Sequence, residues 1–271
     1  MKNHITDDHD LIDVIHSADE SDLAILADFI TDNNKGRVSL DTAIRVQLDT
    51  FKRNETLKKN ADLLIKEIQE FGGNSIANFL RGNGVRYREI VEDVANHMKV
   101  SVEKKDNVED LELKILLAVA IKSMENMSAE EQRDFLNNIS GGKVLFGPGL
   151  LAALQAAILA GGFGSYILAT TVANAVARQL IGRGLAFAAN PVLMRAIAAV
   201  AGPIGWAITA IWTAYDFASP AYRVTVPCVV QIAYMRQKAK EPQLPHCNQC
   251  GAGLTSGQQF CPECGTKVEA A

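Results

Sequence analysis

Two Cys-x-x-Cys pairs near the C-terminal end carry the clearest chemistry of this 271-residue sequence. Ten residues separate the pairs, whose members are Cys247, Cys250, Cys261 and Cys264. Four thiolates complete the tetrahedral shell of Zn²⁺ at about 2.3 Å and leave no position for a reactive water. We therefore predict one structural zinc ion held by these side chains; four free thiols with this spacing by chance are the weaker alternative. His246 precedes the first cysteine, but the shell is already full, so we assign it no role.

The segment around these cysteines, residues 246–267 (HCNQCGAGLTSGQQFCPECGTK), resembles the short zinc-ribbon domains at the ends of many bacterial proteins. The resemblance includes Phe260 and Lys267, and it implies that the four cysteines are the ligands. Such ribbons usually bind partners or steady a neighbouring domain. Lys267 is the only basic residue of this ribbon, and Glu263 and Glu269 lie near it in sequence, so the positive face of a nucleic-acid ribbon is missing. We expect a protein partner.

A second candidate for chemistry is a pair of glycine-containing stretches, Gly72–Ser75 and Arg81–Gly84, followed by Arg86 and Arg88. Glycine amides and nearby arginines can bind phosphate. However, neither stretch has the order of a phosphate-binding loop, and no strand is predicted before them. Turns at helix ends are the favoured interpretation.

The histidines and the fifth cysteine give no catalytic pattern. His16 and His97 lie on predicted helices without another ligand at metal-binding spacing, and Cys228 stands alone in an apolar stretch. No nucleophile with a base and no pair of carboxylates emerges from the spacing. We therefore expect no enzyme and no cofactor besides zinc.

Residues 1–143 carry repeated helix signals, with apolar side chains at spacings of three and four. Ser17 with Glu20 and Ser128 with Glu131 fit capping boxes. A helix at residues 61–71 should end at a Gly-Gly pair, and further helices are predicted at about residues 75–81, 88–99 and 108–126. An all-α helical bundle follows.

The next region, residues 144–240, is apolar and rich in glycine and alanine. Residues 144–177 and 196–215 contain no charged side chain, so each run is long enough to cross a membrane. Glycines interrupt the first run, and a Gly-Pro-Ile-Gly segment interrupts the second, which favours shorter, packed helices. Pro227 should kink or divide a last helix, and residues 241–245 (EPQLP) read as a linker. The predicted parts are an acidic helical region (1–143), an apolar helical region (144–240), the linker, and a zinc ribbon (246–271).

Charge differs sharply between the first two parts. Residues 1–143 contain 19 Lys/Arg and 27 Asp/Glu, a net charge of −8, whereas residues 144–246 contain 7 and 2, a net charge of +5. We interpret the difference in net charge as a sign that the two parts of the chain lie in different environments. The acidic first part argues against nucleic-acid binding, which needs clustered basic residues.

Most of residues 8–238 resemble the YaaW-like family of uncharacterised bacterial proteins, some of which are grouped with ubiquinol-cytochrome c chaperones. Three segments carry the resemblance: DHDLIDVIHSADESDLAIL (8–26), EFGGNSIANFLRGNGVRYREIVED (70–93) and GPIGWAITAIWTAYDFASPAYRVTVPCVVQIAYMR (202–236). It implies no catalytic residue and gives only a hint of a chaperone role.

Two hypotheses of function follow. In the first, residues 144–240 associate with or insert into a membrane as a colicin-like helical hairpin, with Arg178, Arg183 and Arg195 on anionic headgroups and Trp206 and Trp212 at the interface. In the second, the same helices are a core, and the protein is a soluble adaptor or chaperone-like assembly factor whose ribbon binds a partner protein. The first residues, MKNHITDDHD, do not have the charged, apolar and small-residue pattern of a signal peptide, so we expect none. We therefore expect a cytoplasmic location, with peripheral or inducible association with the inner membrane under the first hypothesis.

Overall fold

The structure, a computed structural model, describes residues 7–31, 42–71, 84–125, 127–140, 150–159, 161–185 and 222–241, and eleven positions of the ribbon, namely 247, 249, 250, 254, 259–261 and 264–267. Its helices are α1 (His9–Ser17), α2 (Glu20–Ile30), α3 (Thr42–Arg53), the 3-10 turn η1 (Lys58–Asn60), α4 (Ala61–Phe71), α6 (Tyr87–His97), α7 (Val108–Met124), α8 (Ala129–Ser140), α9 (Leu150–Leu159), α10 (Phe163–Ile181) and α12 (Tyr222–Lys240). Within these ranges the only β pairing is an isolated bridge in the ribbon. The all-α prediction is confirmed.

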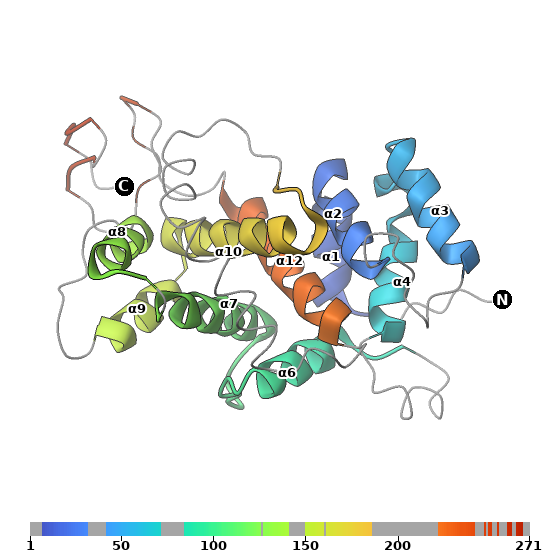
Figure 1. Cartoon of the computed structure of the whole chain (residues 1–271), viewed down its shortest axis with the longest axis horizontal. Helices are drawn as coiled ribbons and strands as arrows, with labels where there is room; N and C mark the ends of the chain where they lie inside the picture. Colours follow the sequence, from blue (N-terminus) through green and yellow to red (C-terminus); the bar gives the residue numbers. More distant parts are fainter. Residues whose placement is uncertain are drawn as a thin grey trace.

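Helices α10 and α12 occupy the middle of the molecule (Figure 1). On one side lie α1 to α4, on the other lie α7, α8 and α9, and α6 packs below α12. Fully buried side chains from both sequence regions, such as Leu11 of α1, Leu116 of α7, Leu168 of α10 and Ile232 of α12, belong to one hydrophobic cluster. Helices of the predicted acidic and apolar regions therefore share a core, and the region boundaries stay predictions.

The caps show why the N-terminal helices begin where they do. Ser128 and Glu131 form the predicted capping box, with Ser128 N donating to Glu131 Oε2 at 2.7 Å and Glu131 N donating to Ser128 Oγ at 3.3 Å. The box predicted at Ser17 and Glu20 is wrong. Ser17 is the last residue of α1 and donates its hydroxyl to Val14 O, while Asp19 caps α2.

Helix α10 explains why residues 150–181 lack acidic residues and carry only one basic residue, Arg178. All fifteen residues from Phe163 to Ala177 are buried, because α12, α7, α8, α2 and α9 pack around them. Gly161 and Gly162, with φ of 78° and 96°, separate α10 from α9, as the glycines predicted. In the part of the chain that the structure describes, no helix is long and apolar enough to span a bilayer.

The structure tests the expectation about Pro227. Helix α12 continues from Tyr222 through Pro227 to Lys240, so the proline does not divide it. Pro227 lies in the second turn, where its missing N–H removes one hydrogen bond near the helix end. The charge-free run at 196–215, with Trp206 and Trp212, and the helix predicted at 75–81 lie outside the described residues.

Candidate metal centre

The four predicted zinc ligands come together at the C-terminal ribbon. Cys247 Sγ lies 3.6 Å from Cys264 Sγ, and Cys250 Sγ lies 3.6 Å from Cys261 Sγ. All four sulfurs lie within 4.8 Å of one another, and no other such group occurs among the described residues. Zinc–sulfur bonds of about 2.3 Å imply a sulfur–sulfur separation of about 3.8 Å in a tetrahedron, so the four side chains fit one zinc ion.

Backbone hydrogen bonds shape the second cysteine pair. Cys261 N donates to Thr266 O at 2.8 Å, and Gly265 N donates to Cys261 O at 2.9 Å. Gly265 has φ of 73°, which L side chains rarely adopt, so glycine suits the turn after Cys264. Phe260 and Lys267 then face each other in an antiparallel bridge.

Burial and charge divide the cysteines into two kinds. Cys247 and Cys261 are buried with Leu254 in a small cluster distinct from the helical core, whereas Cys250 and Cys264 are exposed. Hydrogen bonding to the side chain and then the backbone of Thr266 lowers the pKa of the Cys264 thiol to about 6. The thiolate is the form that binds a metal. When bound, zinc would cross-link the two turns and supply no open coordination position.

The other candidates of the sequence do not join this site. His16 Nε2 lies 3.1 Å from Asp62 Oδ1, and the His97 ring stacks on Tyr222 with 3.7 Å between ring centroids. Of the proposed phosphate cradle, residues 72–83 lie outside the described ranges. Arg88 Nε donates to Glu92 Oε1 at 2.8 Å within α6.

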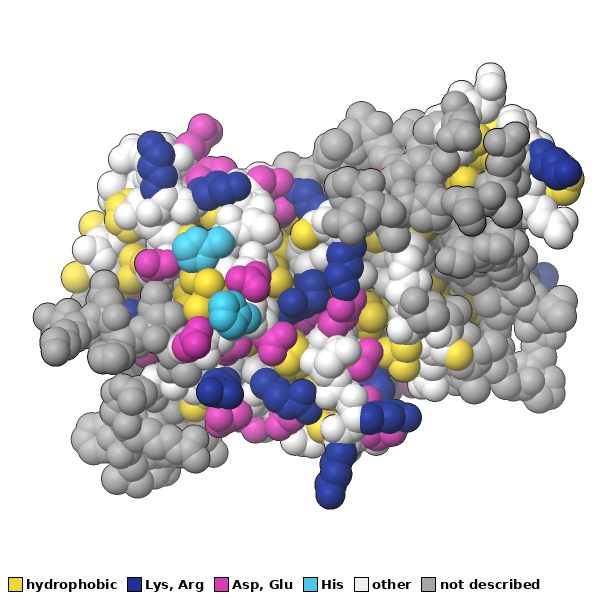
Figure 2. Space-filling model, turned by 180° about the vertical axis from the view of Figure 1, so that it is seen from behind, with side chains coloured by type: hydrophobic (Ala, Val, Ile, Leu, Met, Phe, Trp, Pro, Cys, Tyr) yellow, Lys and Arg dark blue, Asp and Glu magenta, His cyan; other side chains and the backbone are white. Residues whose placement is uncertain are grey.

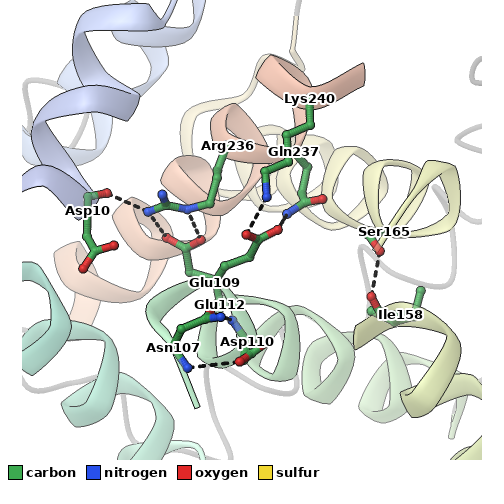
Figure 3. A network of polar contacts seen from close by, with 10 residues as sticks. All are labelled: Asp10, Asn107, Glu109, Asp110, Glu112, Ile158, Ser165, Arg236, Gln237 and Lys240. Atoms are coloured by element: carbon green, nitrogen blue, oxygen red, sulfur yellow. Dashed lines mark hydrogen bonds and ion pairs between the residues drawn. The ribbon is translucent and has the colours of Figure 1, made fainter. Parts of the chain in front are cut away.

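Sequence reasoning missed a set of ion pairs that join α12 to the N-terminal half. Figure 3 shows Arg236, Gln237 and Lys240 pointing toward Glu109 and Glu112 of α7. Arg236 Nε lies 2.7 Å from Glu112 Oε2, and Lys240 Nζ lies 2.5 Å from Glu109 Oε2. Arg236 also donates to the backbone oxygen of Asp10, so it binds the first turn of α1.

Glu112 is the most enclosed carboxylate of this set, with 1% of its side chain exposed. The Tyr87 hydroxyl donates to its Oε1 at 2.8 Å, and Arg236 donates to both of its oxygens. Burial raises the pKa of Glu112, although Arg236 and Tyr87 favour the charged form.

Lys238 binds two aspartates at the start of α2, the cap residue Asp19 and Asp22 in the first turn. Its Nζ lies 2.6 Å from Asp19 Oδ2 and 2.7 Å from Asp22 Oδ2. Burial raises the pKa of Asp22 to about 6. Burial opposes the ionised form of Asp19 too, yet hydrogen bonds from Lys238, Ser21 and the Asp22 amide lower its pKa to about 2.

A third link connects α2 with the end of α10. Asp28, with 3% of its side chain exposed, accepts from Lys52 Nζ at 2.5 Å and from Arg183 Nε at 3.2 Å. Arg183, which the membrane hypothesis placed on lipid headgroups, thus binds a carboxylate of this chain. Arg178 lies in the last turn of α10, and Arg195 lies outside the described residues.

Positive and negative side chains also alternate on the described part of the face seen in Figure 2, where histidines lie among acidic residues. No broad basic region is visible there. The opposite net charges of the two sequence regions are thus matched, in the described part, by ion pairs between them. The charge difference was the sequence signal from which these pairs could have been inferred.

Comparison with known proteins finds relatives of most of the chain and a family model that matches the ribbon. Residues 246–268 match the family model described as a zinc-ribbon domain. A UPF0174 protein of Helicobacter pylori (strain J99) is 36% identical over 236 residues, which cover 86% of this chain and 93% of the relative. A second UPF0174 protein, from H. pylori strain 26695, is 37% identical over 183 residues, 65% of this chain and 88% of the relative.

The chain therefore belongs to the UPF0174 family and ends in a zinc-ribbon domain able to bind one zinc ion. The UPF0174 protein YaaW of Escherichia coli (strain K12) is 29% identical over 252 residues, 90% of this chain and 100% of the relative. The YaaW-like resemblance is thereby confirmed. The names of these relatives state no activity, so the relation to ubiquinol-cytochrome c chaperones stays a prediction. No solved structure matches the chain significantly.

Proposed function

We propose that this protein is an adaptor whose zinc ribbon binds a partner protein through the face that carries Phe260. One observation carries the proposal: the Phe260 side chain is 58% exposed. Among the described residues, the only other large hydrophobic side chain so exposed is Val46 of α3. Exposed aromatic side chains are typical anchors of protein interfaces, because they bury a large apolar area on binding.

Zinc contributes to this function by holding the ribbon backbone. Phe260 directly precedes the predicted ligand Cys261 and pairs with Lys267 across the turn that Cys264 begins. Fixing both cysteine pairs on one ion would keep the aromatic ring and the cation of Lys267 side by side. The partner surface that fits is apolar with an acidic group at its edge.

The helical body supports an adaptor more than a membrane-inserting protein. Helix α10, the longest apolar helix described, is enclosed by five other helices, and Arg183 is bound to Asp28. The enclosure of α10 supports the view that the apolar helices of the described chain are a core.

Photo-cross-linking in cells tests the adaptor proposal. A photoreactive residue at Gln259, an exposed neighbour of Phe260, should give a discrete cross-linked protein, and Phe260→Ala should abolish it. The same residue at Thr50, one turn from Val46 on α3, is the matched control. Identical products from both positions, or products that survive Phe260→Ala, would contradict the proposal.

Vesicle flotation tests the membrane alternative. The full chain is required, because α10 and α12 pack on helices of residues 1–143. We expect it to stay with the unbound fraction when mixed with phosphatidylglycerol vesicles at low salt. Flotation at low salt that high salt reverses would favour the membrane hypothesis instead.

A further inference from the structure

A groove of about 530 Å³ lies along the outer face of α7, between α9 and the connection from α6 to α7. Its volume is in the range of small-molecule pockets. Six apolar side chains of the described chain contribute to its lining, namely Met98, Val100, Leu117, Ala118, Ile121 and Leu159. Three of them, Leu117, Ala118 and Ile121, follow one another at helical spacing on α7, so they form an apolar strip.

Lysines and carboxylates also line this groove, and their pairing is unequal. Glu103 lies 3.7 Å from Lys114, and Glu125 lies 2.5 Å from Lys122. Lys114 in turn lies 2.6 Å from the buried Asp106. Lys99 lines the same groove, but no carboxylate of the described chain lies within ion-pair distance of it. The groove therefore offers one cation for an external anion.

The backbone at Lys99 adds an independent observation. Lys99 N donates to Asn96 O, and Val100 N donates to Ala95 O, which is the Schellman ending of α6. The left-handed position of this motif is usually glycine, yet Lys99 occupies it with φ of 58°. The chain thus keeps an exposed, charged side chain at a position where glycine would be less strained.

We propose that this groove binds a linear aliphatic carboxylate, with the carboxylate on Lys99 and the chain along Leu117, Ala118 and Ile121. An apolar strip with one available cation matches an anion that has an apolar tail. This inference is independent of the ribbon's proposed function, since none of the described ribbon residues lines the groove.

Titration calorimetry of the full protein with decanoate tests the site. The wild-type protein should bind decanoate and not decyltrimethylammonium, which has a similar tail and the opposite charge. Lys99→Gly should weaken decanoate binding about tenfold, the effect of losing one charge-assisted hydrogen bond. Ala118→Phe, which fills the apolar strip and leaves the charges unchanged, should also weaken it.

Two matched variants separate binding from structural effects. Glu55→Gly replaces the other described non-glycine residue with positive φ, just after α3, and Lys59→Ala removes an exposed lysine that does not line the groove. Both should keep wild-type affinity. Lys99→Gly and Glu55→Gly should both raise the melting temperature, because glycine relieves the positive φ, but only Lys99→Gly should lose affinity.

Three results would overturn the inference. They are no decanoate binding by the wild-type protein, unchanged binding by Lys99→Gly, and an equal loss of affinity in Lys59→Ala. A membrane surface offers similar charge chemistry, so phosphatidylglycerol vesicles form a separate arm. Binding to vesicles that depends on Lys99, without binding of free decanoate, would also overturn it.

Discussion

At Glu112, Arg236 Nε and the Tyr87 hydroxyl bind a carboxylate that water does not reach. Removing one partner of such a pair leaves an unpaired buried charge, whereas replacing both with apolar residues is often neutral. Each member of the set depends on the others in this way. Arg236, whose own side chain is only 14% exposed, is therefore important for stability.

We predict that Arg236→Ala lowers the free energy of unfolding by about 3–5 kcal/mol. Urea denaturation followed by circular dichroism measures it. Lys240→Ala is the matched control, because the Lys240 side chain is 49% exposed, and it should cost less than about 1 kcal/mol. The triple variant Arg236→Met, Glu112→Leu, Tyr87→Phe, which makes the whole set apolar, should recover much of the loss. Equal effects of Arg236→Ala and Lys240→Ala would refute this account.

Asp22 gives a prediction about pH. Its pKa in the folded protein is about 6, above the ordinary value of 3.8, so the folded state binds this proton more tightly than the unfolded state does. The contribution of Asp22 to stability therefore increases as pH falls from 7 toward 4, by about 2 kcal/mol. The Asp22→Asn variant has no carboxyl group at this position, so it cannot take up this proton.

The measurement compares unfolding free energies of the wild-type protein and Asp22→Asn at pH 7 and pH 4. The wild-type protein should gain about 2 kcal/mol relative to the variant at the lower pH. Acidic groups that contact neither Asp22 nor Lys238 titrate in both proteins and cancel in the comparison. Parallel pH profiles would show that Asp22 does not titrate in this range.

At the scale of elements, Gly164 lets α10 approach α8. A Cβ at Gly164 would lie 2.4 Å from Ile139 O, a backbone atom that cannot move aside cheaply. We predict that Gly164→Ala lowers stability by about 1–3 kcal/mol, the range for overpacked cores. Thermal unfolding measures it, with Gln155→Ala at an exposed position of α9 as the near-neutral control. Unchanged stability of Gly164→Ala would mean that the two helices are less closely packed.

The same scale shows what the sequence could predict about the fold. Local signals worked where both partners are near in sequence, as at Ser128 and Glu131 and at the glycines before α10. They failed at Glu20, whose carboxylate accepts from the amides of Leu57 and Lys58, far along the chain. A capping pattern cannot show that a distant backbone competes for the same side chain.

The candidate site follows a similar division. The cysteine spacing was enough to predict four sulfurs around one ion, because spacing and coordination geometry are both local. Two other features could not be predicted from the sequence, because the exposure of Phe260 and the pairing of Lys238 with Asp22 depend on tertiary packing. Charge totals indicated only that the two regions were opposite in sign.

For the whole molecule, zinc removal should affect one part alone. The ribbon's buried cluster is separate from the helical core. We predict that a chelator or Cys261→Ser unfolds residues 246–267 and leaves far-ultraviolet ellipticity nearly unchanged. NMR amide signals of the ribbon, Gly265 for example, report its loss. A large fall in helicity would show that the ribbon and the helices fold together.

The most direct test of the central claim is the affinity of the partner identified by cross-linking for the full, zinc-loaded protein and its variants. We predict that Phe260→Ala weakens binding at least about tenfold, as expected for an aromatic anchor, while Val46→Ala binds like the wild-type protein. Equal affinity of the wild-type protein and Phe260→Ala would contradict the claim that the ribbon binds its partner through this face.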